Sequence, residues 1–239
     1  MKKPAKTPIA LSDGADDQAA VEPKVGQIIE TDSDLTEIAA IVDRSGSMWK
    51  IKTETEQAFD GYVADQRGQD GRANLTLVQF DTKIETDYRS KPLIAVPPLH
   101  LQPRGLTALY DAIGITIVDL GTRIAKLERR PGKVVVVILT DGEENSSKEW
   151  TADMLKRAVQ ARKNEGWTFI YLGANQDAVF EGSKIGIDAD SSLTFDIGNV
   201  GTASHLASTA TSQVRSTGKF TGYTKAQRES AAKPKELGA

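Results

Sequence analysis

The sequence predicts an α/β protein in which a mostly parallel β-sheet is covered by helices on both faces. Short apolar runs typical of buried strands alternate along the chain with longer segments whose apolar residues recur at helical spacing. Only one pair of predicted strands is separated by a gap short enough for a hairpin, so the other strands need crossover connections and run parallel. The length of 239 residues and the apolar fraction of 39% are ordinary for a soluble globular protein.

The first predicted strand covers residues 37–42 (EIAAIV), a continuous apolar run that ends at Asp43, as a buried central strand would. A helix is predicted over residues 51–66, because its apolar and small side chains share one face, and Gly68 ends it. Residues 73–80 alternate in the manner of a strand.

Residues 84–96 are predicted to form an antiparallel strand at the edge of the sheet. They follow the preceding strand after only three residues (DTK), which permits a hairpin and not a crossover. Pro92, Pro97 and Pro98 suit an edge strand or its exit, because proline has no N–H to donate.

The second half of the chain repeats the alternation. Residues 109–127 carry apolar side chains at helical spacing, and residues 133–139 (KVVVVIL) predict a parallel strand that is buried on both faces. The remaining predicted elements are a helix around 154–161 with Thr151 as its cap and Gly166 as its stop, a strand at 167–172, a short helix at 176–183, a strand at 192–197 and a helix at 200–214.

Both ends of the chain are expected to lie outside this domain, which spans residues 36–217. Residues 1–35 carry four Lys against seven Asp or Glu and little that could form a core, so we expect a flexible or partner-bound arm. Residues 218–239 carry five Lys or Arg against two Glu, which predicts a short, solvated basic tail with one weak helix around residues 224–232.

The composition excludes several classes of function. Lys and Arg number 30 and Asp and Glu 33, a balance that gives no reason to expect nucleic-acid binding. The absence of cysteine excludes disulfides and thiolate metal sites, and the only histidines, His100 and His205, are expected to be structural or solvated. The longest apolar run, residues 134–139, is far shorter than the roughly 20 residues of a membrane span. We therefore expect a cytoplasmic protein, or a component of a particle assembled in the cytoplasm.

Three polar loops are predicted at the carboxyl ends of strands or at the start of a helix, where ligands bind in such sheets. They span residues 43–48, 105–113 and 139–145. Their candidate ligands are the side chains of Asp43, Ser45, Ser47, Thr107 and Asp141. These oxygen donors suit a hard divalent cation such as Mg²⁺ and no soft metal. Gly46 lets the backbone turn tightly, so that both serine hydroxyls can point at one spot.

The motifs DRSGS, GLTALYDAIG and LTDGEE, in this order and separation, closely resemble those of the von Willebrand factor A (vWA) domain and its metal-ion-dependent adhesion site (MIDAS). The resemblance covers the whole predicted domain. It implies a three-layer, doubly wound, Rossmann-like fold with a six-stranded, mostly parallel sheet and one antiparallel edge strand. It also implies that the hydroxyls of Ser45, Ser47 and Thr107 hold Mg²⁺, or Mn²⁺ or Ca²⁺. Asp43 and Asp141 would act directly or through water.

Each motif also has a plainer interpretation. Residues 43–48 could cap the following helix, because Ser and Asp are preferred at helix N-termini. Residues 140–142 could form an ordinary turn at the end of a strand. Tyr110 and Asp111 are expected to pack beneath the site. The occurrence of all three motifs in succession favours the metal site.

The resemblance implies a binding module and not an enzyme. If neutral hydroxyls are the direct ligands, the ion keeps much of its double positive charge, and an Asp or Glu of a partner protein can fill the open coordination position. A rim of Trp49, Arg104 and Glu143 is expected to select that partner, with Arg104 pairing with the incoming carboxylate and Glu143 and Glu144 repelling misplaced acids.

Residues 171–177 (YLGANQD) and the GSKIGID that follows resemble intracellular bacterial and phage vWA proteins. The partners that this resemblance implies include AAA+ ATPases of the MoxR type, metal-stress operon proteins and phage assemblies. We therefore expect an adaptor in a cytoplasmic assembly or, if the protein is phage-encoded, a virion component.

Two alternatives stay open. One is a structural component of a phage particle, in which neighbouring subunits order both tails. The other is a Mg²⁺-dependent phosphohydrolase, because haloacid-dehalogenase-like enzymes also place an Asp nucleophile at a strand end. Those enzymes need a second acid two residues further on, where this chain has Ser45, so the usual general acid is missing.

Overall fold

The computed structural model describes residues 30–234. Its strands are β1 (Glu30–Asp43), β2 (Arg72–Phe80), β3 (Ile84–Pro92), β4 (Arg129–Thr140), β5 (Thr168–Ala174) and β6 (Ser192–Phe195). Its α-helices are α1 (Lys52–Arg67), α2 (Leu109–Ala125), α3 (Ala152–Asn164), α4 (Ala178–Lys184), α5 (Val200–Thr217) and α6 (Lys225–Ala232). Short 3₁₀ helices include η1 (Gly46–Ile51) and η2 (Leu93–Ala95).

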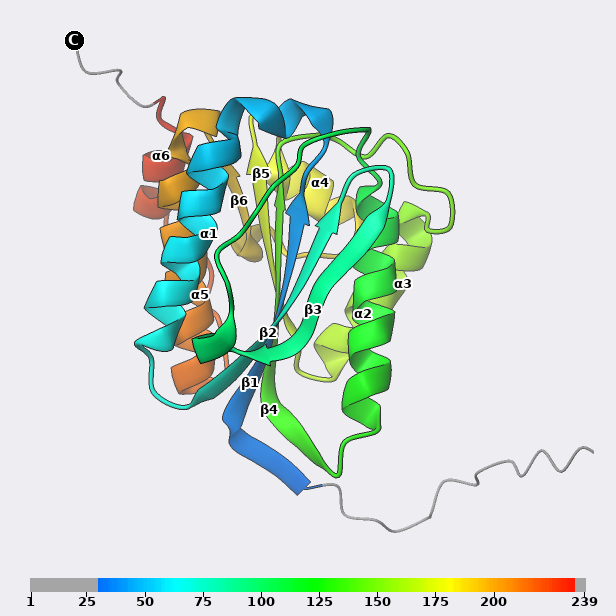
Figure 1. Ribbon diagram of the computed structural model, residues 1–239, viewed down its shortest axis with the longest axis vertical. Helices are drawn as coiled ribbons and strands as arrows, with labels where there is room; N and C mark the ends of the chain where they lie inside the picture. Colours follow the sequence, from blue (N-terminus) through cyan, green and yellow to red (C-terminus); the bar gives the residue numbers. More distant parts are fainter. Residues whose placement is uncertain (1–29, 235–239) are drawn as a thin grey trace, which may run out of the picture.

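The strands form one six-stranded sheet in the order β3-β2-β1-β4-β5-β6, with helices on both faces (Figure 1). Every neighbouring pair is parallel except β2 and β3, which pair antiparallel. The predicted three-layer, doubly wound fold with one antiparallel edge strand is therefore confirmed. The short connection between β2 and β3 is the reason, since it cannot cross the sheet.

Two apolar cores lie on opposite faces of the sheet. Successive residues of β1 alternate between them: Ile38 packs with α1 and α5, and Ala39 packs with α2 and α3. Figure 1 shows these two pairs of helices on either side of the strands. Because both faces are covered, the central strands carry the continuous apolar runs seen in the sequence. Within residues 30–234, no helix is both long and apolar enough to cross a membrane.

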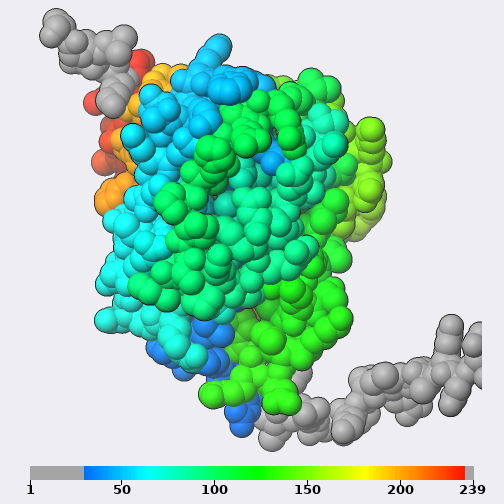
Figure 2. Space-filling view, in the orientation of Figure 1, coloured from blue at the N-terminus to red at the C-terminus, as the bar shows by residue number. Residues whose placement is uncertain are grey.

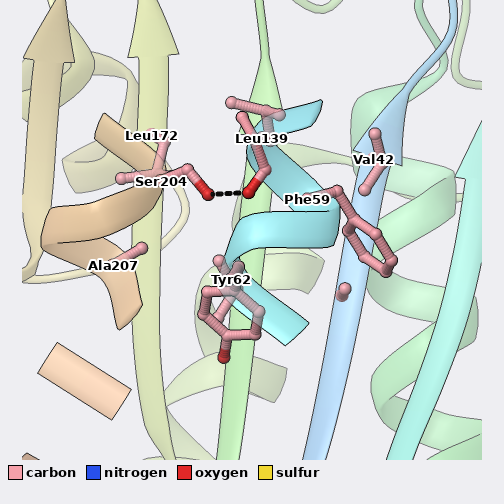
Figure 3. A pocket seen from close by; sticks show the side chains of 10 residues that line it. Val42, Phe59, Tyr62, Leu139, Leu172, Ser204 and Ala207 are labelled. Atoms are coloured by element: carbon pink, nitrogen blue, oxygen red, sulfur yellow. Dashed lines mark hydrogen bonds between the residues drawn. The ribbon is translucent and has the colours of Figure 1, made fainter. Parts of the chain in front are cut away.

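A small cavity lies between α1, α5 and the sheet (Figure 3). Phe59 and Tyr62 of α1 line it, and beside it Ser204 Oγ of α5 donates a hydrogen bond of 2.7 Å to the backbone oxygen of Ala58. A second hydrogen bond, 2.9 Å long, joins the hydroxyls of Tyr62 and Thr211. These polar contacts tie α5 to α1 in addition to the apolar packing.

Strand β1 starts earlier than predicted, at Glu30 rather than at residue 37. Glu30–Asp32 pairs with Arg129–Pro131 of β4, and the register shifts before Thr36. Residues 30–35, which we expected in the flexible arm, therefore belong to the sheet, and the rest of that arm lies outside the described residues. These first strand residues are mostly polar, so hydrophobic patterning could not reveal them.

Strand β3 is shorter than predicted and ends at Pro92, because the next residues form η2. Pro92 is the last residue of β3 in register with β2. The carbonyl oxygens beyond it accept hydrogen bonds from the Arg67 side chain, at 2.9 Å for Leu93 and 2.7 Å for Val96. Beyond Pro92 the Arg67 side chain, and not a neighbouring strand, therefore donates to these carbonyl oxygens.

The C-terminal segment is not the solvated tail that we expected. Helix α6 begins with a capping box formed by Thr224 and Gln227, and the predicted weak helix at 224–232 is confirmed. However, Tyr223 and Ala231 are buried in the core, and the backbone N–H of Asp196 donates to the oxygen of Ala231 at 3.0 Å. The segment therefore packs on the outer end of the sheet beside β6.

Candidate metal centre

The predicted site lies at the carboxyl edge of the sheet. Strands β1 and β4 are parallel neighbours, with Val42 in register with Leu139, so the loops that follow them emerge side by side. The loop at residues 105–113, which leads into α2, joins them: the backbone N–H of Gly46 donates to the oxygen of Gly105 at 3.2 Å. In Figure 1 these loops meet at the top of the sheet.

Two serine hydroxyls and one carboxylate form a continuous chain of oxygens. Ser45 Oγ lies 3.0 Å from Ser47 Oγ, and Ser47 Oγ donates to Asp141 Oδ1 at 2.6 Å. The 3₁₀ turn that starts at Gly46 makes this possible, because the N–H of Met48 bonds to the oxygen of Ser45 and brings the serines to one side. The structure therefore brings these three side chains together.

Thr107 reaches the same point from the loop at residues 105–113. A methyl group placed on the α-carbon of Gly142 would lie 3.3 Å from Thr107 Oγ1 and 4.0 Å from Ser47 Oγ. Both hydroxyls therefore border the space that glycine leaves free. The backbone of Thr107 is held by Asn145, whose Oδ1 accepts from Thr107 N at 2.9 Å and whose N–H donates to Thr107 O at 3.0 Å.

Asp43 is fully buried beside this cluster. Its Oδ1 accepts from the backbone N–H of Ser45 and its Oδ2 from Thr140 Oγ1, both at 2.6 Å. Burial raises the pKa of Asp43 to about 6, and the neighbouring Asp141 carboxylate adds to this in spite of the hydrogen bonds. Burial also raises the pKa of Asp141. Two carboxylates that are costly to ionise would gain from a cation between them.

The sequence reasoning placed Thr140 in the loop at residues 139–145 but assigned it no role at the site. Its hydroxyl fixes the Asp43 carboxylate and also accepts from the N–H of Gly142 at 3.2 Å. Hydrogen-bonded partners of this kind orient metal-binding carboxylates. Sequence reasoning could have found Thr140 from its position directly before Asp141, at the end of a central strand.

The sequence reasoning also missed a closed ring of four charges beside the site. Asp81 Oδ2 accepts from the Nε atoms of Arg44 and Arg104, both at 2.9 Å. Glu85 accepts from the other ends of the same two guanidiniums, at 2.9 Å and 2.8 Å. Arg44 and Asp81 are 5% and 2% exposed, so half of the ring is buried.

The turn between β2 and β3 holds the loop that carries Thr107. The oxygen of Asp81 accepts from the N–H of Ala108 at 3.0 Å, and Thr82 Oγ1 accepts from the N–H of Leu106 at 3.0 Å. The oxygen of Arg44 accepts from the N–H of Arg104 at 2.8 Å. Main-chain bonds and the charged ring therefore connect the loops that carry Ser45 and Thr107 to the same hairpin.

The pairing of Arg104 with an incoming carboxylate stays a prediction. In the structure its guanidinium pairs with Asp81 and Glu85 through Nε and Nη2, and its side chain is 48% exposed. Trp49 is 63% exposed and Glu143 is also exposed, as a rim position requires. Glu144 instead binds its own loop, where it accepts from the N–H groups of Ser146 and Ser147 and from that of Tyr110.

The remaining polar residues have structural contacts. Asp111 is buried, and its carboxylate accepts three backbone N–H bonds from residues 148–150. His100 and His205 are exposed beside Glu56 and Asp65. Across residues 30–234, no three His, Cys, Asp or Glu side chains group to hold a metal.

A doubly wound sheet with hydroxyls and carboxylates gathered at its carboxyl edge defines a class of ligand-binding α/β domain. A family model places the chain more closely: the model of the von Willebrand factor type A domain matches residues 37–209. The chain therefore belongs to the vWA family, and the predicted resemblance is confirmed. No curated protein sequence matches it.

Solved structures share the fold at low sequence identity. The vWF domain of the type V pili tip protein Mfa5 from Porphyromonas gingivalis is 12% identical, with a TM-score of 0.54 over 80% of this chain and 98% of that one. Manganese-loaded TRAP from Plasmodium vivax is 15% identical, with a TM-score of 0.51 over 72% of both chains. Proximal thread matrix protein 1 from the mussel byssus is 18% identical, with a TM-score of 0.51 over 73% of this chain. The present chain spans less than half of that mussel protein's length, 45%.

Proposed function

We propose that this chain is a divalent-metal-dependent protein-binding module. The observation that carries the proposal is the spacing of its oxygens, 3.0 Å from Ser45 Oγ to Ser47 Oγ and 2.6 Å from Ser47 Oγ to Asp141 Oδ1. Adjacent ligands of an octahedral Mg²⁺ ion, with bonds of roughly 2.0–2.1 Å, lie about 2.9 Å apart. The donor set is therefore close to the spacing that such an ion needs.

We propose that five residues would hold the ion. Ser45, Ser47 and Thr107 would supply hydroxyl oxygens, and Asp43 and Asp141 would act directly or through water. When bound, the ion would supply positive charge next to the buried carboxylate of Asp43 and the partly exposed one of Asp141, and would attract an anionic oxygen of a partner. We propose Mg²⁺ as the ion, with Mn²⁺ as a practical test ion because the similarly folded TRAP protein carries manganese.

The same geometry favours binding over catalysis. A phosphohydrolase would need Asp43 as an exposed nucleophile, yet this residue is 0% exposed and both of its oxygens already accept hydrogen bonds. A buried carboxylate that is held in this way can orient ligands but cannot reach a substrate.

We propose that the partner is a protein that presents an Asp or Glu side chain to the ion. An AAA+ ATPase or another component of a bacterial or phage assembly is the partner class that the intracellular vWA resemblance implies, and a cytoplasmic adaptor role would follow. The exposed Trp49 and Glu143 beside the site support a docking surface there.

The test begins with titration calorimetry of Mn²⁺ and Mg²⁺ into the full chain. We expect one site per chain in the wild type and its loss in the double variant Ser45→Ala/Ser47→Ala. Ser216→Ala, an exposed serine on α5, is the matched control and should bind as the wild type does. An affinity capture in Mg²⁺ and in EDTA, read by mass spectrometry, then identifies metal-dependent partners. Equal ion binding by the wild type and the double variant would contradict the proposal.

A further inference from the structure

Two large apolar side chains stand in solvent beside the proposed metal site. Trp49 is 63% exposed and Leu106 is 56% exposed. Trp49 follows Ser47 by two residues, and Leu106 directly precedes Thr107. In Figure 2 the segment around residue 50 (blue) and the segment around residue 105 (green) form one continuous surface at the top of the molecule. Each apolar side chain is therefore attached to a loop that carries a candidate ligand.

The backbone holds both side chains in place. The two loops are joined by the hydrogen bond from Gly46 N to Gly105 O. Gly105 adopts a φ of +67°, and a side chain there would come within 2.8 Å of Thr82 Oγ1, so the tight turn before Leu106 requires glycine. On the other loop, Met48 is fully buried and anchors the turn that presents Trp49. Both residues are exposed because well-ordered turns present them to solvent.

The charges near these residues are largely cancelled. Arg44 and Arg104 are paired with Asp81 and Glu85 in the closed ring, which carries no net charge. Lys50 and Glu143 follow the candidate ligands Ser47 and Asp141 in the sequence and are exposed and opposite in sign. The ring therefore adds no net charge to this surface, where Trp49 and Leu106 offer apolar contact.

We infer that the partner segment carries an acidic residue flanked by apolar side chains, and that Trp49 and Leu106 bind these flanking side chains. This inference rests on the proposed metal-dependent function and specifies its partner. Exposed apolar groups next to a polar anchor are typical of interaction sites, and tryptophan is enriched among residues that dominate binding energy. Their burial would also exclude water from the contact between ion and carboxylate, which strengthens that contact.

The test uses three short, disulfide-closed peptides that differ only at the centre: Leu-Asp-Leu, Ser-Asp-Ser and Leu-Asn-Leu. Their affinities for the full chain are measured in saturating Mn²⁺ and in EDTA. We expect Leu-Asp-Leu to bind about tenfold more tightly than Ser-Asp-Ser, which corresponds to about 1.4 kcal/mol. Leu-Asn-Leu should bind weakly, and EDTA should abolish the binding of all three.

Two variants of the protein test whether Trp49 and Leu106 cause the preference for Leu-Asp-Leu. In Trp49→Ser/Leu106→Ser the advantage of Leu-Asp-Leu over Ser-Asp-Ser should disappear, while Mn²⁺ affinity stays unchanged. Ile94→Ser is the matched control, since Ile94 is 84% exposed and follows β3 at the opposite edge of the sheet. Equal affinity for the two Asp peptides, an unchanged preference in the double variant, or no peptide binding by the Mn²⁺-loaded chain would overturn the inference. Failure to bind Mn²⁺ would instead overturn the proposed function itself.

Discussion

The buried half of the charged ring provides a sharp test of the energetics of this edge of the sheet. Asp81 accepts hydrogen bonds from the Nε atoms of Arg44 and Arg104 and from the backbone N–H of Lys83. Asp81→Asn keeps the size of the side chain and removes its charge. Arg44 then remains 5% exposed, with its Nη2 already lacking a hydrogen-bond partner.

The expected cost follows from the burial of the pair. Removing one partner of a buried ion pair costs about 3–5 kcal/mol, because the remaining charge is left without compensation. Here Arg44 keeps its contact with Glu85, whose side chain is 47% exposed and therefore a weaker partner. We expect a loss of about 2–3 kcal/mol in the free energy of unfolding. For a domain of this size that corresponds to a fall of roughly 5–10 °C in Tm.

Urea denaturation and thermal unfolding of the full chain measure this loss. Asp119→Asn is the matched control, because Asp119 also accepts from two arginines, Arg89 and Arg123, but is 38% exposed. Exposed pairs contribute about 0–1 kcal/mol, so this variant should unfold nearly as the wild type does. Equal destabilisation by the two substitutions would refute the reasoning from burial.

Three further outcomes are expected. Thr140→Val keeps the shape of the side chain but removes the hydrogen bond to Asp43. It should weaken Mn²⁺ binding about 10–100-fold in calorimetry and lower the free energy of unfolding by about 1–3 kcal/mol, because a buried carboxylate oxygen loses its donor. In EDTA, the pKa of Asp43 is raised from 3.8 to about 6, so the folded state holds a proton that the unfolded chain releases. The contribution of this one carboxyl group to the free energy of unfolding should therefore be largest below about pH 4 and fall by up to about 3 kcal/mol as the pH rises to about 6. The difference between the wild type and Asp43→Asn in urea titrations across this range checks it. Tyr62→Phe should cost only about 0.5 kcal/mol in urea denaturation, because the Thr211 hydroxyl still donates to the oxygen of Ala207 at 2.9 Å; a loss above about 2 kcal/mol would contradict this.

The parts of the fold that sequence patterning predicted are those that hydrophobic burial determines. Residues 133–139 lie in the middle of the sheet with both faces covered, and their apolar run allows no other placement. The three-residue connection before β3 left only a hairpin. The expectation that the candidate ligands lie together came from strand direction, since the carboxyl ends of parallel strands share one edge of the sheet.

The parts that patterning missed depend on polar contacts between distant segments. The first residues of β1 are charged and join the sheet only because β4 extends to meet them. The end of β3 is set by Arg67, which is on a different element. Arg44 appeared to be an unremarkable position inside DRSGS, and only the hairpin carrying Asp81 and Glu85 gives it a partner. No periodicity in the sequence encodes such a pairing.

The neutrality of the ring has a consequence for the ion. Arg44 lies between two candidate ligands, and an unpaired guanidinium there would repel a divalent cation. Glu85→Gln leaves the ring with one net positive charge, so Mn²⁺ affinity should fall, more at low than at high salt. Stability should change little, because Glu85 is half exposed. Glu229→Gln, on α6, removes the same amount of charge at a position far from this ring. It should leave the Mn²⁺ affinity unaltered. An equal fall in Mn²⁺ affinity in the two variants would show that the affinity depends only on the total charge of the protein and not on the charge of the ring.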